Sequence, residues 1–222
     1  MIPYVPLKIE RPEKVLDIPS HLAGTSWAGN ESIIADLLDR FHVGRKSALE
    51  FGVEFGYSAV ALSNFFDKVI GVDTFLGDEH SNFRPDYSED ARNLCAPYDN
   101  IKLVQSSWED WTVKAPVKAR YDLIHIDIVH NYQPTFDCGL WAVKHAPIVI
   151  FHDTLSFHDV MRACEDLAEQ QKLNFYNYEY NFGLGILSAR EPEPGESTAS
   201  VEHGELSQRE KRILQKVLGG QW

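Results

Sequence analysis

A turn with two glycines, set between two strand-like runs, constrains this chain more than any other part of its sequence. The run Ser47–Phe51 leads into Gly52 and Gly56, a helical segment follows, and the run Lys68–Asp73 ends on an acid. Such a unit holds a nucleoside cofactor, because glycine lets the backbone approach the ligand and the acid accepts hydrogen bonds from ribose hydroxyls. The unit therefore predicts a parallel α/β sheet with a nucleoside site at its edge.

Further apolar runs continue the alternation of strands and helices. We expect strands at Ile101–Gln105, Tyr121–Asp127 and Pro147–Asp153, and a closing antiparallel pair at Asn174–Tyr178 and Phe182–Leu187. Helical patterns separate these runs, which favours an α/β fold with helices on both faces of the sheet. The sequence thus predicts a doubly wound, mostly parallel sheet of seven strands with an antiparallel C-terminal strand, whose ligands bind above the carboxyl ends of the strands.

Polar residues mark helix starts and one long connection in this pattern. Asn131 is expected to cap a helix, and a capping box is expected to start at Ser156. The polar stretch Thr74–Asp86 leaves the carboxyl end of the second strand, so it is either a loop over the substrate or a solvated connection.

Composition divides the 222 residues into four parts. Residues 1–29 form a Pro-rich arm, residues 30–190 form the α/β domain, and residues 191–206 read as a flexible linker rich in Glu, Pro, Gly and Ser. The apolar pattern of residues 207–222 predicts a short amphipathic helix. Because so short a helix cannot bury its apolar face alone, it should dock on the domain or on a second copy of the chain, which leaves a homo-oligomer open.

Charge and cysteine content narrow the partners and the compartment. The net charge is −12, with 33 acids against 21 Lys and Arg, so binding to nucleic acid or to anionic membranes is disfavoured. The cysteines Cys95, Cys138 and Cys164 are odd in number and widely spaced, which indicates free thiols. No signal peptide is visible, and no apolar run reaches the roughly 20 residues of a membrane helix. We therefore expect a cytoplasmic protein.

Four motifs, taken together, resemble one enzyme family. They are Glu50-Phe-Gly-Val-Glu-Phe-Gly56-Tyr-Ser58, Gly71-Val-Asp73-Thr-Phe75, His125-Ile-Asp127 with His130-Asn-Tyr132, and Phe151-His152-Asp153-Thr154. Over about residues 45–190 the chain resembles the class I S-adenosylmethionine-dependent methyltransferases. More narrowly, it is similar to the small-molecule O-methyltransferases of the catechol type and of the macrocin/novobiocin sugar type.

The resemblance implies a set of residues that bind S-adenosylmethionine. By matched position these are Glu50, Gly52, Gly56, Ser58, Asp73, Ser107, Trp108 and Asp127. Within this set, Asp73 would take the ribose hydroxyls, Ser58 would stand near the methionine carboxylate, and Trp108 would flank the adenine.

The resemblance also implies a divalent metal held by Asp127, His152 and Asp153. It points first to Mg²⁺, whereas two carboxylates with an imidazole favour Mn²⁺, Fe²⁺ or Zn²⁺ on ligand preference, so the metal stays open. The chain departs from the family at Ile128 and Val129, where a glycine is common, and at His152, where the best-known metal-dependent members carry an acid. A structural pair of His152 and Asp153 without metal is the other interpretation.

The function that follows is methyl transfer to a hydroxyl of a small-molecule acceptor. The hydroxyl has to lose its proton, and a divalent metal lowers its pKa. His130 lies three residues after Asp127 and is a candidate general base, since a histidine titrates near pH 6.5; it can also be a plain loop histidine. Aromatic residues in the arm and in the Thr74–Asp86 loop favour a ring-bearing or sugar acceptor.

Two other functions stay open. An NAD-dependent oxidoreductase is disfavoured because Glu54 occupies the position where a second glycine admits the diphosphate. The second is a catalytically silent methyltransferase-like fold used for binding or assembly, which the unusual Ile128 and Val129 keep open.

Overall fold

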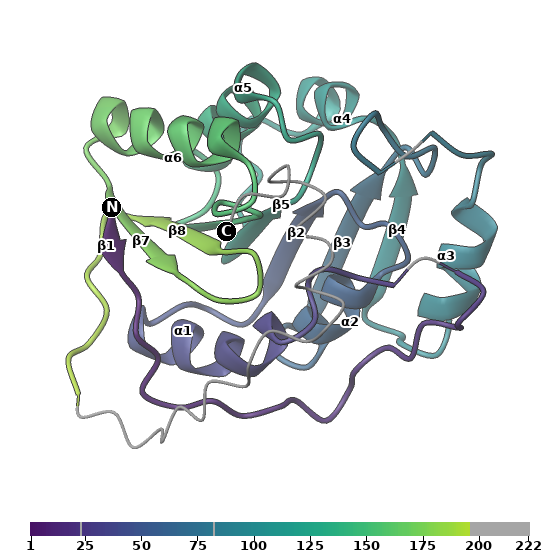
Figure 1. Ribbon diagram of the computed structural model, residues 1–222, viewed down its shortest axis with the longest axis horizontal. Coiled ribbons are helices and arrows are strands. Elements are labelled where there is room, and N and C mark those ends of the chain that lie inside the picture. Colours follow the sequence, from purple (N-terminus) through teal and green to yellow (C-terminus); the bar gives the residue numbers. More distant parts are fainter. Residues whose placement is uncertain (23, 82, 196–222) are drawn as a thin grey trace, which may run out of the picture.

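Eight strands form one sheet, in the order β1-β7-β8-β6-β5-β2-β3-β4 (Figure 1). The computed structural model describes residues 1–22, 24–81 and 83–195. The strands are β1 (Ile2–Pro3), β2 (Ser47–Phe51), β3 (Lys68–Asp73), β4 (Ile101–Gln105), β5 (Leu123–Ile126), β6 (Ile148–His152), β7 (Asn174–Tyr178) and β8 (Leu184–Ser188). Only β8 runs against its neighbours β6 and β7, and the remaining pairs are parallel. The predicted mostly parallel sheet is confirmed, and the arm adds β1 to its seven strands.

Helices cover both faces of the sheet (Figure 1). They are the 3₁₀ helix η1 (Asn30–Ile33) and the α-helices α1 (Ile34–Arg40), α2 (Tyr57–Ser63), α3 (Ser88–Cys95), α4 (Trp108–Lys114), α5 (Tyr132–Ala142) and α6 (His158–Gln171). One core cluster joins α1 and α2 to the sheet, and a second joins α5 and α6 to its other face. Because both faces are covered, central strands such as β6 are buried along their whole length.

Strand bounds follow the sequence closely, but helix starts do not. The side chain of Asn131 precedes α5 without capping it, and instead donates a hydrogen bond to Glu79 Oε1 at 2.6 Å. The N-cap of α6 is Phe157, so the capping box predicted at Ser156 is wrong. At Asn131 a contact with the Thr74–Asp86 loop replaces local capping, whereas the Ser156 hydroxyl is buried without a hydrogen-bond partner in the described part of the chain.

The arm packs on the domain instead of hanging free. β1 pairs with β7, and Tyr4 donates a hydrogen bond to Asp36 Oδ2 at 2.6 Å. At the other end, Glu193 accepts a hydrogen bond from Arg40 Nε at 2.8 Å, so the first residues of the predicted linker also contact the domain. The remainder of that linker and the predicted helix 207–222 lie outside the described residues. In the part of the chain that the structure describes, no helix is long and apolar enough to cross a membrane.

Candidate active site

A cavity of about 840 Å³ opens at the carboxyl ends of the parallel strands. Each central strand delivers at least one residue to its lining: Gly52 after β2, Asp73 on β3, Ser106 after β4, Asp127 after β5 and Asp153 after β6. Strand order alone thus gathers side chains that are distant in sequence, as expected for the ligand site of a doubly wound sheet.

The turn after β2 needs glycine at Gly52. Its φ is 84°, and a Cβ atom there would collide with the backbone carbonyl of Asp127. The turn can therefore approach the loop after β5 only without a side chain. This close approach narrows the floor of the cavity between Gly52 and Asp127.

Asp73 fixes the same turn from the neighbouring strand. Its Oδ2 accepts hydrogen bonds from the backbone N–H groups of Val53 at 2.7 Å and Glu54 at 2.9 Å. Its Oδ1 accepts a third from Phe75 at 2.6 Å. A carboxylate offers about four acceptor positions, so one remains on Oδ1 for a ligand.

Glu54 faces the cavity in the left-handed conformation, with φ of 51°. Arg84 donates a hydrogen bond to Glu54 Oε1 at 2.9 Å and lies against the rings of Phe55 and Tyr87. Burial raises the pKa of Glu54, and the Arg84 guanidinium opposes that shift. A polar residue held in strained backbone at a cavity wall is typical of a functional position.

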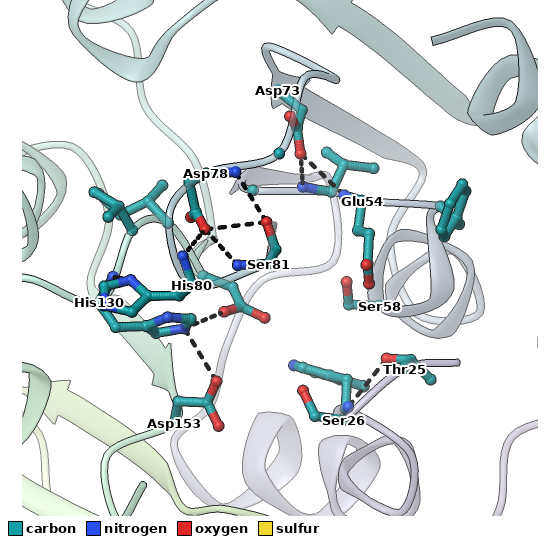
Figure 2. Close-up of a pocket in the computed structure, with 18 of the residues that line it drawn as sticks. Thr25, Ser26, Glu54, Ser58, Asp73, Asp78, His80, Ser81, His130 and Asp153 are labelled. Carbon is teal, nitrogen blue, oxygen red and sulfur yellow. Dashed lines mark hydrogen bonds and ion pairs between the residues drawn. The ribbon is translucent and has the colours of Figure 1, made fainter. Parts of the chain in front are cut away.

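On the opposite side of the cavity, Asp127, His130 and Asp153 form a cluster. Figure 2 shows the ring of His130 directed toward Asp153. One ligand atom from each lies within 4.8 Å of the others, and His130 Nε2 is 3.0 Å from Asp153 Oδ2 and 3.4 Å from Asp127 Oδ1. Asp153 has φ of 61°, which turns its side chain out of the line of β6 toward His130. The cluster is thus built from two strand ends and one loop.

His152 lies next to this cluster, beneath the surface of the cavity. It is almost fully buried, its Nε2 lies 3.2 Å from the Asn181 carbonyl oxygen, and its Nδ1 is 3.2 Å from Asp127 Oδ2. The Asn181 carbonyl fixes the proton on Nε2, so that Nδ1 presents its lone pair to the carboxylates when the ring is neutral. The Nδ1 atom of His152 also lies 3.6 Å from Asp153 Oδ2, so the predicted place of His152 in a metal site stays a prediction, and His130 joins the two aspartates as a further candidate ligand.

The charges of the cluster stabilise one another. Burial lowers the pKa of His130, but Asp127 and Asp153 outweigh burial and raise it to about 10. The same balance raises the pKa of His152. Burial raises the pKa of Asp127, but the imidazoles of His152 and His130 hold it well below its usual value. Without a bound cation, the carboxylates consequently favour the protonated form of both imidazoles.

The donor set fits a divalent ion. Both ring nitrogens of His130 and Nδ1 of His152 are buried without an aligned hydrogen bond, although carboxylate oxygens lie close to them. Buried nitrogens of this kind need either a proton and a partner or a cation. Two carboxylates and an imidazole are common ligands of first-row divalent metals.

No protein-family model matches this chain. The uncharacterized protein y4gI of Sinorhizobium fredii (strain NBRC 101917 / NGR234) is 27% identical over 154 residues, which cover 63% of this chain. The match spans only 16% of that curated relative, so the relative is a much longer protein.

Solved structures share the architecture. A protein of Klebsiella pneumoniae assigned as an O-methyltransferase aligns with a TM-score of 0.55 at 16% identity, over 78% of this chain and 84% of its own. A Staphylococcus aureus protein assigned as a caffeoyl-CoA O-methyltransferase gives 0.52 at 17%, over 78% and 85%. The Bacillus cereus O-methyltransferase in complex with S-adenosylhomocysteine gives 0.51 at 13%, over 77% and 84%.

The chain has the class I methyltransferase fold. Of the residues that the sequence assigns to the cofactor, those lining the cavity are Gly52, Ser58, Asp73, Ser107, Trp108 and Asp127. Glu50 and Gly56 support this methyltransferase fold from outside the lining: Glu50 is fully buried against His125, and a Cβ atom at Gly56 would collide with Cys95 Sγ. Contact between these residues and a cofactor stays a prediction.

Other residues of the site carry no signal of their own in the sequence. Thr25 and Ser26 of the arm face Ser58 across the cavity (Figure 2). His80 is exposed at the rim of the cavity and accepts a hydrogen bond at Nδ1 from the backbone N–H of His130 at 3.3 Å. The position of the Thr74–Asp86 loop at a strand end was the available clue for His80, whereas the arm has no periodic pattern.

Proposed function

We propose that this chain transfers a methyl group from S-adenosylmethionine to a hydroxyl of a small molecule, with help from a divalent ion. The observation that carries the proposal is a single cavity that joins the glycine turn and Asp73 to the Asp127, His130 and Asp153 cluster. The shared fold and the bound S-adenosylhomocysteine of the Bacillus cereus structure support the choice of cofactor.

The turn side of the cavity suits the cofactor. The free acceptor position on Asp73 can take a ribose hydroxyl, while its other positions hold the turn in place. Trp108 offers an apolar surface for the adenine, and the hydroxyls of Ser58 and Ser26 can bind the methionine carboxylate. Most of this cofactor side of the cavity is already formed in the free chain, so binding costs less conformational entropy.

The cluster side suits the ion. Asp127, Asp153 and His130 would hold it, with His152 orienting Asp127. A bound divalent ion lowers the pKa of an acceptor hydroxyl and fixes its orientation. Because the pKa of His130 is about 10 in the ion-free cluster, this residue is a poor base at neutral pH, and we assign it to the ion. The ligand types favour Mn²⁺, Fe²⁺ or Zn²⁺, and Mg²⁺ remains the ion that the resemblance favours.

Calorimetry tests the cofactor directly. We expect S-adenosylmethionine and S-adenosylhomocysteine to bind and NAD not to bind.

Turnover is then measured on hydroxylated aromatic and sugar acceptors, in chelator and after Mn²⁺ or Mg²⁺ is restored. Asp153→Asn should lose the ion response and keep the cofactor affinity. Absence of binding to both sulfur compounds at millimolar concentration would refute the proposal. Binding without turnover under any metal would favour the catalytically silent fold.

A cytoplasmic location of the protein remains a prediction. It rests on the three cysteines, which are free and buried among the described residues. The net charge of −12 continues to disfavour nucleic acid as a partner.

A further inference from the structure

The charges that line the cavity are strongly one-sided. Six carboxylates line it: Glu54, Asp73, Asp78, Glu109, Asp127 and Asp153. Neither Lys nor Arg is found in the lining over residues 1–22, 24–81 and 83–195. A ligand group that enters this cavity therefore meets negative charge on several sides.

Basic residues near the cavity are already engaged. Arg84 lies behind Glu54, to which it donates, and is enclosed by the rings of Phe55 and Tyr87. His80 Nδ1 accepts a hydrogen bond from the backbone N–H of His130 at 3.3 Å, and the His80 ring lies against Phe157. Neither side chain is placed to pair with an anion inside the cavity.

The proposed cofactor and ion do not reverse this balance. A divalent cation compensates Asp127 and Asp153, and the sulfonium of the methyl donor adds one positive charge. Asp73 and Asp78 are hydrogen-bonded to backbone N–H groups, which orients their charge without removing it. Carboxylates thus remain in excess in the loaded site, on a molecule whose net charge is −12.

The wall beyond the cluster is apolar and offers no compensation. Leu155, Phe157 and Phe182 line it, and the ring of Phe157 stacks on His130 at a centroid distance of 4.1 Å. A carboxylate or phosphate buried there would be unpaired, which is costly. An uncharged ring would pack favourably, and an ammonium would gain from the acids and from the aromatic faces.

We propose that the acceptor of this site is a neutral or cationic hydroxyl compound, and that the cavity rejects acceptors bearing carboxylate or phosphate. The inference rests on the proposed function and adds the charge class of the substrate. It separates this chain from any enzyme of the same fold that acts on an acyl-coenzyme A, whose phosphates need cationic partners.

A charge series on a constant ring tests the inference. Catechol, dopamine, protocatechuate and caffeoyl-coenzyme A share the vicinal hydroxyls and differ in charge. Their affinities are measured by calorimetry on the full chain loaded with Mn²⁺ and S-adenosylhomocysteine, so the readout does not require turnover. We expect dopamine and catechol to bind at least about tenfold more tightly than the two anions at 0.1 M salt, and the difference to shrink at 0.5 M salt.

A designed reversal sharpens the test. The side chain of Leu155 is 46% exposed and lines the wall near Asp153. Leu155→Lys should reduce the discrimination against protocatechuate by about tenfold. Leu155→Met, of similar size and without charge, should keep the order of the four compounds.

The outcomes separate the two proposals. Equal or tighter binding of the anions by the wild-type chain overturns the charge inference, and so does the failure of all four compounds to bind. Methylation of an anionic acceptor would overturn it while leaving the proposed function intact. Failure of S-adenosylhomocysteine itself to bind would refute the proposed function, and the charge series on the Mn²⁺-loaded chain alone would still decide the charge inference by the same criteria.

Discussion

At Asp73, one side chain joins three parts of the site. Its carboxylate accepts hydrogen bonds from backbone N–H groups of the turn after β2 and of Phe75, and one acceptor position stays open to the cavity. The sequence assigns this residue to ribose alone. Its bonds to the turn are invisible in the sequence because they depend on how two neighbouring strands end.

Replacing Asp73 should therefore have two separable effects. Asp73→Ala leaves three backbone donors without their partner and should lower the free energy of unfolding by about 2–4 kcal/mol. The same change should weaken binding of the cofactor by about 1–3 kcal/mol. Urea denaturation and calorimetry measure the two quantities. Unchanged affinity would argue against a ribose contact, and unchanged stability would argue against the bonds to the turn.

His130 gives the ion-free protein a pH signature. Its pKa is about 10 in the folded chain, whereas an unfolded histidine titrates near about 6.5. Between these two pKa values, His130 is protonated in the folded state and neutral in the unfolded state. The stabilisation is therefore complete below about pH 6.5, declines as the pH rises, and is lost above about pH 10.

In chelator, the free energy of unfolding should fall by about 3 kcal/mol between pH 6.5 and 9. Denaturation curves at several pH values measure this decline. His130→Gln cannot take up the proton, so its curve should be flatter. If wild type and variant decline in parallel, His130 is not the group responsible.

At the scale of elements, strands were far more predictable than helix ends. β2, β3 and β4 have the bounds that the sequence predicts. For β2 and β3 this follows because a buried parallel strand needs a mostly apolar stretch, whereas β4 is a partly buried edge strand. β1 was not predicted, since its two residues, Ile2 and Pro3, join the sheet through backbone bonds that leave no side-chain pattern.

The site shows the same division. Asp73, Asp127 and Asp153 were predictable because each follows or ends an apolar run, and strand ends meet at one edge. The arm and the Thr74–Asp86 loop were expected near the acceptor, but Ser26 and His80 were not singled out, because neither segment has a periodic pattern that marks individual residues. The grouping of His130 with the aspartates depends on the turn of Asp153 out of its strand.

Gly56, directly before α2, lies close to Cys95 at the end of α3. A Cβ atom at Gly56 would collide with Cys95 Sγ, and its φ of 94° disfavours other residues. Gly56→Ala should therefore destabilise the chain, and Cys95→Ala should relieve part of the collision. We expect the double variant to be about 1 kcal/mol more stable than the sum of the single changes predicts. Strict additivity in thermal or urea unfolding would contradict this packing.

At the scale of the whole molecule, a buried polar chain ties the arm to the sheet. Trp27 donates its indole N–H to His125 Nε2 at 3.1 Å, and His125 Nδ1 donates to Glu50 at 2.8 Å. All three side chains are buried. Because Trp27 lies next to Ser26 in the cavity wall, this chain of bonds also holds part of the site.

Trp27→Phe keeps the ring and leaves His125 without a donor. We expect a loss of about 1–3 kcal/mol in the free energy of unfolding and weaker binding of the cofactor. Trp141→Phe is a matched control, since Trp141 packs on Phe51 away from the cavity lining. It should change stability by packing alone and spare the affinity. Equal loss of affinity in both variants would show that the arm does not shape the site.

Arg40 binds the two ends of the described chain to the same helix. It donates to the Val5 carbonyl oxygen at 2.9 Å and to the Glu193 carbonyl oxygen at 2.8 Å, and Gly195 lies against Leu7. Through these two bonds a single guanidinium couples the arm to the segment after β8, so the loss of this one side chain would loosen both segments from α1.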